Sequence, residues 1–275
     1  LLYCFRMLGL FMVLPLLALY AADLPGATPT RIGLAIGIYG LMQAALQIPL
    51  GWLSDKVGRK PVIVAGLLLF ILGSVVAAMA DSIGGIILGR TLQGAGAIAS
   101  TVMALVADLT REEQRTKAMA VVGVSIGLSF AVALVLGPAV AAIGSLSAVF
   151  WFTAVLAVIG IVIVTVLVPS APVVREGLVA GADMGVLRRS LENRVLLRLN
   201  FGVFVLHFIL TASFLLVPGL LEQSFGVDRE QHWKVYLPVL LLSLAGMVPL
   251  MVLAERGGRL RMAFLVGIAL VFAAV

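Results

Sequence analysis

Long apolar runs separated by short polar segments make up most of this chain. Each run is continuous and close to the ~20 residues that an α-helix needs to cross the hydrocarbon of a bilayer. The alternation over about ten residues that is typical of a membrane β-barrel does not occur. We therefore predict an all-α, polytopic membrane protein with eight spanning helices and part of a ninth. The expected spans are residues 1–22, 32–54, 61–80, 83–107, 118–142, 148–168, 195–221, 235–254 and a partial span from 262.

Composition supports this interpretation. Hydrophobic residues make up 62% of the chain and charged residues 12%, against roughly 45–50% and 25% in ordinary globular proteins. A soluble fold of 275 residues could not bury so much apolar surface. The shortage of charge also argues against a nucleic-acid-binding protein, despite a net charge of +6. A single cysteine, Cys4, excludes an internal disulfide.

The basic residues are distributed unevenly between the two sets of loops. Of 19 Lys and Arg residues, 14 lie in the loops after spans two, four, six and eight. Positive residues stay on the cytoplasmic side of a membrane. We therefore expect the even-numbered spans to end in the cytoplasm, and the N-terminus to be cytoplasmic. The remaining five are Arg31, Arg229 and Lys234 in the opposite loops, and Arg6 and Arg90 inside spans.

The longest polar connection divides the chain. Residues 169–194 form the expected cytoplasmic linker between an N-terminal six-helix half (1–168) and the start of a C-terminal half (195–275). A spacing also recurs 200 positions apart, which indicates an internal duplication: Gly51, Asp55, Gly58 and Arg59 return as Met251, Glu255, Gly258 and Arg259. The chain begins at Leu1, without a Met, inside an apolar run, and its last run from Met262 to Val275 has only 14 residues, where a span needs about 20. We therefore expect the chain to be a fragment of a longer protein.

The most informative motif is GWLSDKVGRKPVI, residues 51–63. Gly51 allows close approach of a neighbouring helix, Asp55 ends a span with a carboxylate, and Gly58 permits a tight turn. Arg59 fixes this turn on the cytoplasmic side. The alternative interpretation is a solvated, positively charged turn with no role beyond topology.

This motif resembles the signature between helices two and three of the major facilitator superfamily. Further segments resemble the same family in order. LGRTLQGAGAIA, residues 88–99, resembles its fourth-helix motif with an intramembrane arginine, and DLTREEQRTKAMA, residues 108–120, resembles the loop behind that helix. Gly137 and Pro138 match the centre of the antiporter motif in helix five. Ala141 and Ala142 replace the usual glycine pair, which weakens the case for obligatory antiport.

The resemblance implies two six-helix halves around a central cavity, with this chain covering helices one to about nine. It also implies a conformational latch at the cytoplasmic face. In this latch Arg59 reaches Asp108, Asp55 faces a helix of the second half, and Gly51, Gly58 and Arg115 complete the motif. The latch would stabilise the outward-open state.

Two arginines inside spans are candidates for the cavity. An unpaired arginine at the centre of a membrane helix costs about 2.5–3.5 kcal/mol, so Arg90 should face protein or water and not lipid. It either senses the charge of substrate or protons, or ties two helices together. Gln93 lies one turn further along the same motif. Arg6 follows the same logic, although its long side chain could also extend to the membrane surface.

Other polar residues inside spans are weaker candidates. His207 is the only histidine inside a span, and its ordinary pKa near 6.5 suits a proton carrier. A hydrogen bond to a neighbouring helix is the common alternative. Tyr39, Gln43 and Gln47 recur every four residues and so share one face of helix two, where they either line the cavity or hold helices together. No acidic residue lies centrally in a span.

We expect neither a cofactor nor a metal, because the sequence carries no nucleotide-binding loop and no cluster of Cys or His ligands. The expected function is secondary active transport of small molecules, with proton-coupled efflux suggested by the resemblance. The expected partners are the lipid bilayer, an unidentified small-molecule substrate and protons, and the expected state is a monomer in the bacterial inner membrane. A polytopic receptor, a membrane-embedded enzyme and a channel are the alternatives.

Overall fold

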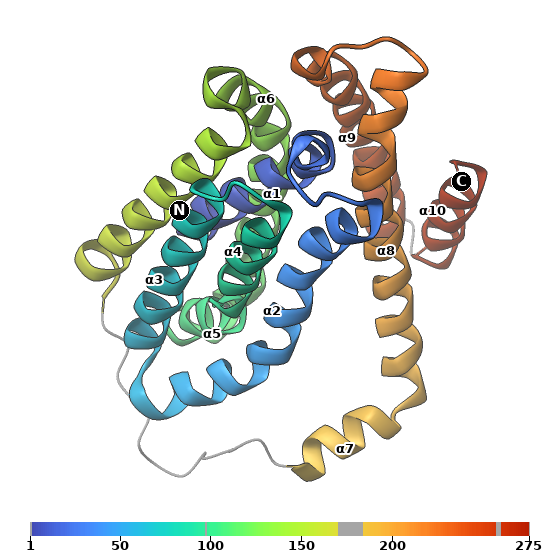
Figure 1. The fold of residues 1–275 in the computed structure, drawn as a ribbon. Coiled ribbons are helices and arrows are strands. Elements are labelled where there is room, and N and C mark those ends of the chain that lie inside the picture. Colours follow the sequence, from blue (N-terminus) through green and yellow to red (C-terminus); the bar gives the residue numbers. More distant parts are fainter. Residues whose placement is uncertain (1, 97, 170–183, 257–259, 275) are drawn as a thin grey trace. The chain divides into compact units, whose positions relative to one another are not determined.

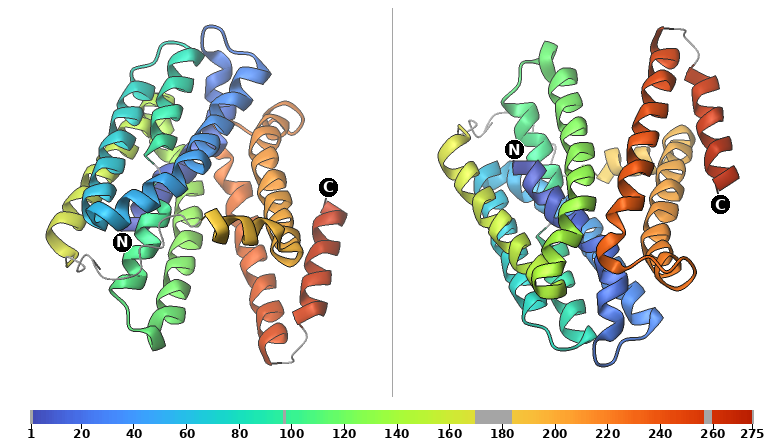
Figure 2. Two further views of the ribbon diagram at one scale, coloured as in Figure 1. Left: turned by 90° about the horizontal axis from the view of Figure 1, so that it is seen from below. Right: turned by 90° about the horizontal axis from the view of Figure 1, so that it is seen from above.

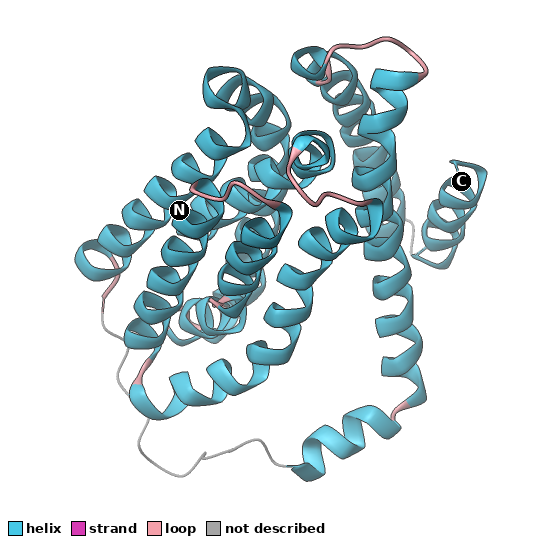
Figure 3. Ribbon diagram, in the orientation of Figure 1, coloured by secondary structure: helices cyan, strands magenta, loops and turns pink. Residues whose placement is uncertain are grey.

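The computed structural model describes residues 2–96, 98–169, 184–256 and 260–274. Every regular element in these ranges is a helix (Figure 3), as the apolar pattern predicts. The α-helices labelled in Figure 1 are α1 (Leu2–Tyr20), α2 (Pro29–Val57), α3 (Arg59–Ala78), α4 (Ile83–Ala95), α5 (Ala99–Asp108), α6 (Arg115–Val162), α7 (Met184–Glu192), α8 (Arg194–Gln223), α9 (Trp233–Arg256) and α10 (Leu260–Ala274). Shorter helical segments are the 3-10 helices η1 (Ala21–Asp23), η2 (Glu112–Gln114) and η4 (Arg229–Gln231) and the π-helix η3 (Ile163–Leu167).

Several helices begin at capping residues that can be recognised in the sequence. The Thr28 hydroxyl accepts a hydrogen bond from the Arg31 backbone N–H at the start of α2, and Pro29 follows at the first helical position. Ser82 caps α4 by accepting from the Gly85 N–H, and Asn193 caps α8 by accepting from Val195. These caps satisfy backbone donors that a helix leaves unpaired.

The helices from α1 to α6 pack closely against one another. The most extensive contacts join α1 with α6, α3 with α4 and α6, and α2 with α4. Figures 1 and 2 show α3 and α4 side by side. A Cβ atom on Gly73 would lie 2.5 Å from the Gly89 carbonyl oxygen. These two glycines therefore let the backbones of α3 and α4 approach more closely than any side chain would allow.

The expected fourth span, residues 83–107, is interrupted. It is divided into α4 and α5, because Gly96 ends α4 with a non-helical ψ of 39°. A Cβ atom on Gly96 would collide with the carbonyl oxygen of Gly66 in α3. The helix is thus interrupted where it packs closely against α3. The prediction of one unbroken helix over this span was wrong.

The expected fifth and sixth spans are joined in one element. α6 has 48 residues, which at 1.5 Å per residue is about 70 Å and more than twice the thickness of a bilayer core. Its backbone leaves the helical conformation at Gly144 and Ser145, where Ser145 has a φ of 56°. α6 is therefore two arms that meet at a turn, and each arm has the length of one span (Figure 1).

Contacts divide the chain into two compact units, Leu1–His232 and Trp233–Val275. α8 belongs to the first unit because it packs against α1, while α9 and α10 pack against each other in the second. The division between halves at residues 169–194 stays a prediction, and the structure adds that α7 lies within this connection. The duplicated residues Gly258 and Arg259, and the side chains of Met251 and Glu255, lie outside the described part of the chain.

Five segments among the described residues are long and apolar enough to cross a membrane. They comprise α1 with η1, α2, α3, the long segment that contains both arms of α6, and α8. Much apolar surface remains exposed, for example Leu128 at 63% and Phe204 at 62%. Such exposure on a soluble monomer would promote aggregation, and it fits helices whose outer faces contact lipid.

Candidate functional site

Four residues meet where α2 passes into α3, and we call them the Arg59 cluster: Ser54, Asp55, Arg59 and Asp108. The guanidinium of Arg59 donates from Nε to Asp108 Oδ2 at 2.9 Å and from Nη1 to Ser54 Oγ at 2.7 Å. It also forms an ion pair with Asp55. The cluster therefore connects the α2–α3 turn to the end of α5.

Local structure explains why the cluster forms. The chain turns sharply at Gly58, whose φ of 101° is unfavourable for any residue with a side chain. Arg59 then begins α3 and Asp108 ends α5. Each charge has the same sign as the partial charge of its own helix end, so each is unfavourable alone. Pairing the two offsets both penalties, and the Arg59 side chain is only 18% exposed.

Two other residues of the predicted latch lie apart from this ion pair. Arg115 forms an ion pair with Glu112, three residues before it, at 3.5 Å. Gly51 packs against α5, where a Cβ atom would lie 3.2 Å from Ser100 Oγ. The Asp55 side chain is 51% exposed, which leaves it accessible to the second-half helix that the resemblance predicts.

A second polar cluster lies inside the helices, and we call it the arginine centre: Arg6, Tyr39, Arg90 and Gln93. Arg6 Nη2 donates to the Tyr39 hydroxyl at 3.1 Å, and the Arg90 guanidinium lies 4.4 Å from the centroid of the same ring. Arg90 Nη1 also donates to Gln93 Oε1 at 2.9 Å. One tyrosine in α2 thus joins arginines from α1 and α4.

The arginine centre is buried and its partners are neutral. Arg6 is 2% exposed and Arg90 is fully buried, as is Gln93. Gln93 is held in place because its Nε2 donates to Ser74 Oγ at 2.8 Å. No ion pair involves either arginine among the residues that the structure describes. Arg6 Nε, Arg6 Nη1 and Arg90 Nη2 are buried without a hydrogen-bond partner.

The predicted stripe on α2 begins at this centre and continues along the helix. Tyr39 is buried, Gln43 is half-buried and accepts from Arg6 Nη2 at 3.4 Å, and Gln47 is half-buried with an unpartnered Oε1. The first two residues therefore contact Arg6 across helices. The stripe forms one side of the arginine centre.

His207 and the helix-five motif lie elsewhere. His207 is an exposed residue of α8, and its Nδ1 lies 2.9 Å from the Val203 carbonyl oxygen of the same helix. Gly137 and Pro138 are buried in the first arm of α6. A Cβ atom on Gly137 would lie 3.4 Å from the Met12 carbonyl oxygen, so this glycine allows α6 to pack closely against α1.

A third cluster was not predicted from the sequence, and we call it the Arg229 cluster: Asp23, Glu222 and Arg229. Arg229 donates to Asp23 Oδ2 at 2.8 Å and to Glu222 Oε1 at 2.9 Å. Its guanidinium also lies 5.6 Å from the centroid of Tyr20. The hydrogen bond to Asp23, supported by Glu222, raises the pKa of Arg229, which therefore stays charged.

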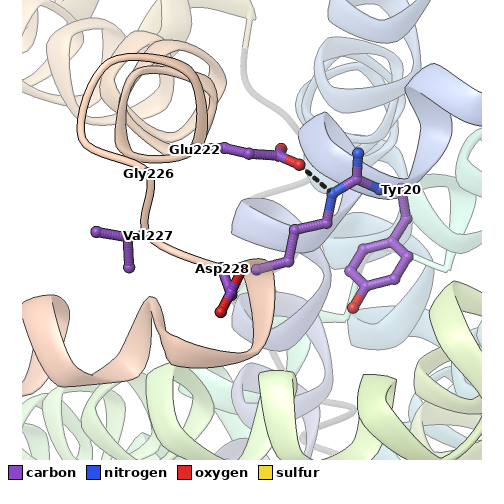
Figure 4. A pocket seen from close by; sticks show the side chains of 6 residues that line it. Tyr20, Glu222, Gly226, Val227 and Asp228 are labelled. Atoms are coloured by element: carbon purple, nitrogen blue, oxygen red, sulfur yellow. Dashed lines mark hydrogen bonds and ion pairs between the residues drawn. The ribbon is translucent and has the colours of Figure 1, made fainter.

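The Arg229 cluster joins the end of α1 to the connection between α8 and α9. In Figure 4 the Glu222 carboxylate points towards the guanidinium beside Tyr20. A cavity of about 510 Å³ adjoins it, lined by Tyr20, Glu222, Gly226, Val227, Asp228 and Arg229. The sequence does contain a signal for this cluster, because Arg229 is one of few basic residues in its set of loops, and Asp23 and Glu222 end spans on the same side.

Comparison with known proteins supports one family. A family model described as the Major Facilitator Superfamily matches residues 1–275. The inner membrane transport protein YajR of Escherichia coli K12 is 48% identical over 99% of this chain, which covers 60% of that protein. The quinolone resistance protein NorA of Staphylococcus aureus is 28% identical over 83% of this chain, which covers 55% of that protein. The chain thus spans about 60% of the length of YajR.

Solved structures agree on the fold. The crystal structure of a bacterial homologue of the human lysosomal transporter Spinster, in an inward-facing and unoccupied conformation, aligns with a TM-score of 0.76 and 14% identity. This alignment covers 93% of this chain and 60% of that one. The comparisons favour a transporter over the receptor and enzyme alternatives.

Proposed function

This chain belongs to the Major Facilitator Superfamily, and on that premise we propose that it acts in proton-coupled efflux of small molecules. In this proposal the protein is a monomeric secondary active transporter of the bacterial inner membrane, with its N-terminus in the cytoplasm. Two halves enclose a cavity and move against each other, so that the cavity opens to one side at a time. The similarity to an inner membrane transport protein supports the location.

The observation that carries the proposal is the Arg59 cluster. Arg59 forms hydrogen bonds to residues of two other helices, Ser54 in α2 and Asp108 in α5. We place the cluster at the cytoplasmic face, because the loops that contain it are rich in basic residues. There it acts as a latch that holds this end of the first half rigid, with Asp55 available to a helix of the second half. A closed latch favours the outward-open state.

The Arg229 cluster gives the opposite end of the protein a comparable device. Asp23 follows α1 in the first half, whereas Glu222 and Arg229 belong to the predicted second half. Their ion pairs therefore connect the two proposed halves on the side opposite the Arg59 cluster. In the proposed cycle these contacts close the outer end and break when the cavity opens outwards.

Several residues inside the predicted spans are candidates for carrying the proton or lining the cavity. His207 is the only histidine inside a predicted span, and Arg90 lies fully buried in α4. Movement of a proton onto His207, onto an acid at the end of a helix, or onto a residue of the longer protein would change the charge of the cavity between the two states. The remaining candidates, Arg6, Tyr39, Gln43, Gln47 and Gln93, line the arginine centre or extend from it.

Reconstitution tests the transport proposal. The full-length protein in liposomes that contain an internal pH dye should move protons when a transported compound is added on one side. A panel of acidic, neutral and basic compounds identifies the responsive class. Movement of compounds with no dependence on a pH gradient would contradict proton coupling. No movement of any compound would contradict transport.

Substitution of Asp55 tests the latch. Asp55→Asn removes the charge that pairs with Arg59 but preserves the shape of the side chain, so transport should fall while the amount of folded protein is unchanged. Glu113→Gln is a matched control, because Glu113 is an exposed acid in a neighbouring loop. Full transport by Asp55→Asn would exclude the latch.

A further inference from the structure

We propose that the arginine centre binds the anionic group of the transported substrate, an organic acid whose carboxylate is held by Arg6 and Arg90. This inference rests on the proposed transport function and names the substrate class for it. It is carried by the charge balance of residues 1–168 and by the donors that the two guanidiniums leave unused.

The charge balance is the first step. Arg6 is 2% exposed and Arg90 is fully buried, and both contact Tyr39. Burying two like charges beside one another is unfavourable unless an opposite charge lies near them. Of the 13 acidic residues in the sequence, none lies in the middle of a span. The first six spans therefore supply no counter-charge at this depth.

The chemistry of arginine is the second step. A buried lysine or histidine can release its proton and become neutral, but a guanidinium keeps its charge under all ordinary conditions. The two arginines cannot remove their charges by titration. The charge that balances them must come from an anion, and the first six spans hold no carboxylate at this depth.

The unused donors are the third step. Tyr39, Gln43, Gln93 and the Ala35 carbonyl accept some N–H groups of the two arginines. Arg6 Nε, Arg6 Nη1 and Arg90 Nη2 remain buried without partners. An oxygen-rich planar anion is the natural acceptor for guanidinium N–H groups. A carboxylate accepts several hydrogen bonds and supplies the missing charge in the same step.

The surroundings indicate how the anion would enter. Gln93 is fixed by Ser74, and the Arg90 guanidinium is stacked on Tyr39, so this side of the centre is rigid. On the other side Gln43 is only half-buried and its contact with Arg6 is long, at 3.4 Å. An incoming carboxylate can replace this weak neutral contact. Gln43 and Gln47 then form the polar approach along α2.

The test measures binding with matched pairs of compounds. The full-length protein in detergent is titrated with benzoate, octanoate and citrate, and with benzamide, octanamide and a citrate triamide as neutral counterparts, while thermal unfolding is recorded. At least one carboxylate should raise the unfolding temperature in a saturable manner, and its amide should not. Equal effects of acids and amides, or no effect of either, would overturn the proposal.

Variants connect this binding to the arginines. Arg6→Gln and Arg90→Gln should each weaken the apparent affinity for the carboxylate at least tenfold. Arg6→Lys, which keeps the charge and covers the case that Arg6→Gln fails to fold, should weaken it less. Arg31→Gln is the control, because Arg31 is an exposed arginine that contacts the Gly26 carbonyl. Carboxylate binding that survives in both glutamine variants would also overturn the proposal.

The two proposals can fail separately. Suppose that Arg6→Gln and Arg90→Gln exchange neutral or basic compounds for protons as fast as the wild type does. The proposed anion site is then wrong, and the proposed transport function is retained. If carboxylates bind through the arginines but liposomes show no transport, the anion site stands and the proposed function is wrong. If a carboxylate elsewhere in the longer protein pairs with the arginines, added acids should raise the unfolding temperature no more than their amides do.

Discussion

Arg59 and Arg90 differ in burial and in the charge of their partners, although both belong to the same helical fold. Arg59 lies at a helix end, partly exposed, with two carboxylates and a hydroxyl around it. Arg90 lies inside, fully buried, with only an amide oxygen, a backbone carbonyl and an aromatic ring as partners. The first arginine has its counter-charges in the described structure, and the second does not.

This difference indicates two kinds of role. A paired arginine at a surface stabilises one arrangement of the backbone, and its contribution is modest because water competes for both charges. A buried arginine without a carboxylate adds nothing to stability through its charge, because desolvation is not repaid. We infer that the charge of such an arginine serves to bind an anionic ligand. Variants of the two arginines should therefore separate a loss of transport from a loss of stability.

Replacement of Arg90 should separate function from stability most clearly. In Arg90→Met, transport should fall by about 30-fold or more, as expected for a buried charged contact worth about 2–5 kcal/mol. Because a buried unpaired charge is removed, the free energy of unfolding should fall by no more than about 2 kcal/mol. Transport by proteoliposomes and thermal unfolding measure the two quantities. A large loss of stability with little loss of transport would reverse the assigned roles.

Replacement of Arg59 should have a smaller effect. Arg59→Gln leaves Asp55 and Asp108 without their partner and should lower transport by roughly tenfold, corresponding to about 1.4 kcal/mol in the latch. Lys56→Gln removes a charge from the same turn and is the control, since the Lys56 ammonium lies over the Trp52 ring. Equal losses in both variants would show that only the net charge of the turn matters.

The turn itself can be tested without changing any charge. Gly58→Ala places a side chain at a φ of 101° and should cost about 1–2 kcal/mol of stability. If the turn positions Arg59, transport should decline with it. Gly37→Ala is a matched control inside α2, where an added Cβ atom would meet no atom within 4 Å. A Gly58→Ala variant as stable as this control would show that the turn adapts.

The smallest effect is expected at the Arg229 cluster. Arg229→Gln removes two partly exposed ion pairs and should change the free energy of unfolding by about 1 kcal/mol or less. It should nevertheless increase labelling of a cysteine placed in the cavity from the outer side, because the contact between α1 and the α8–α9 connection is lost. If the variant is labelled no faster than the wild type at either low or high salt, the cluster does not help to close this end.

Much of this architecture was predictable from the sequence. Hydropathy predicted the helical class, and the caps at Thr28, Ser82 and Asn193 begin helices as residues of these types usually do. The motif around Gly58 predicted a turn there, and the resemblance predicted the pairing of Arg59 with Asp108. These features are local or belong to a recognisable family pattern. The turn at Gly144 and Ser145 lies between the expected fifth and sixth spans. The break at Gly96 was not predicted, since it lies in a sequence as apolar as the helices around it.

The residues of the arginine centre show where sequence reasoning stops. Hydropathy and helical periodicity predicted that Arg6 and Arg90 lie inside apolar segments, that Tyr39 and Gln43 share a helix face, and that no acid lies at the same depth. The tertiary structure brings both arginines into contact with the same tyrosine, which no pattern in the sequence indicates. It likewise decided that Arg229 contacts Asp23, from which it is separated by 206 positions. Hydropathy and periodicity are properties of single segments, whereas such contacts depend on how distant helices pack, and that is set by close approaches such as Gly73 to Gly89.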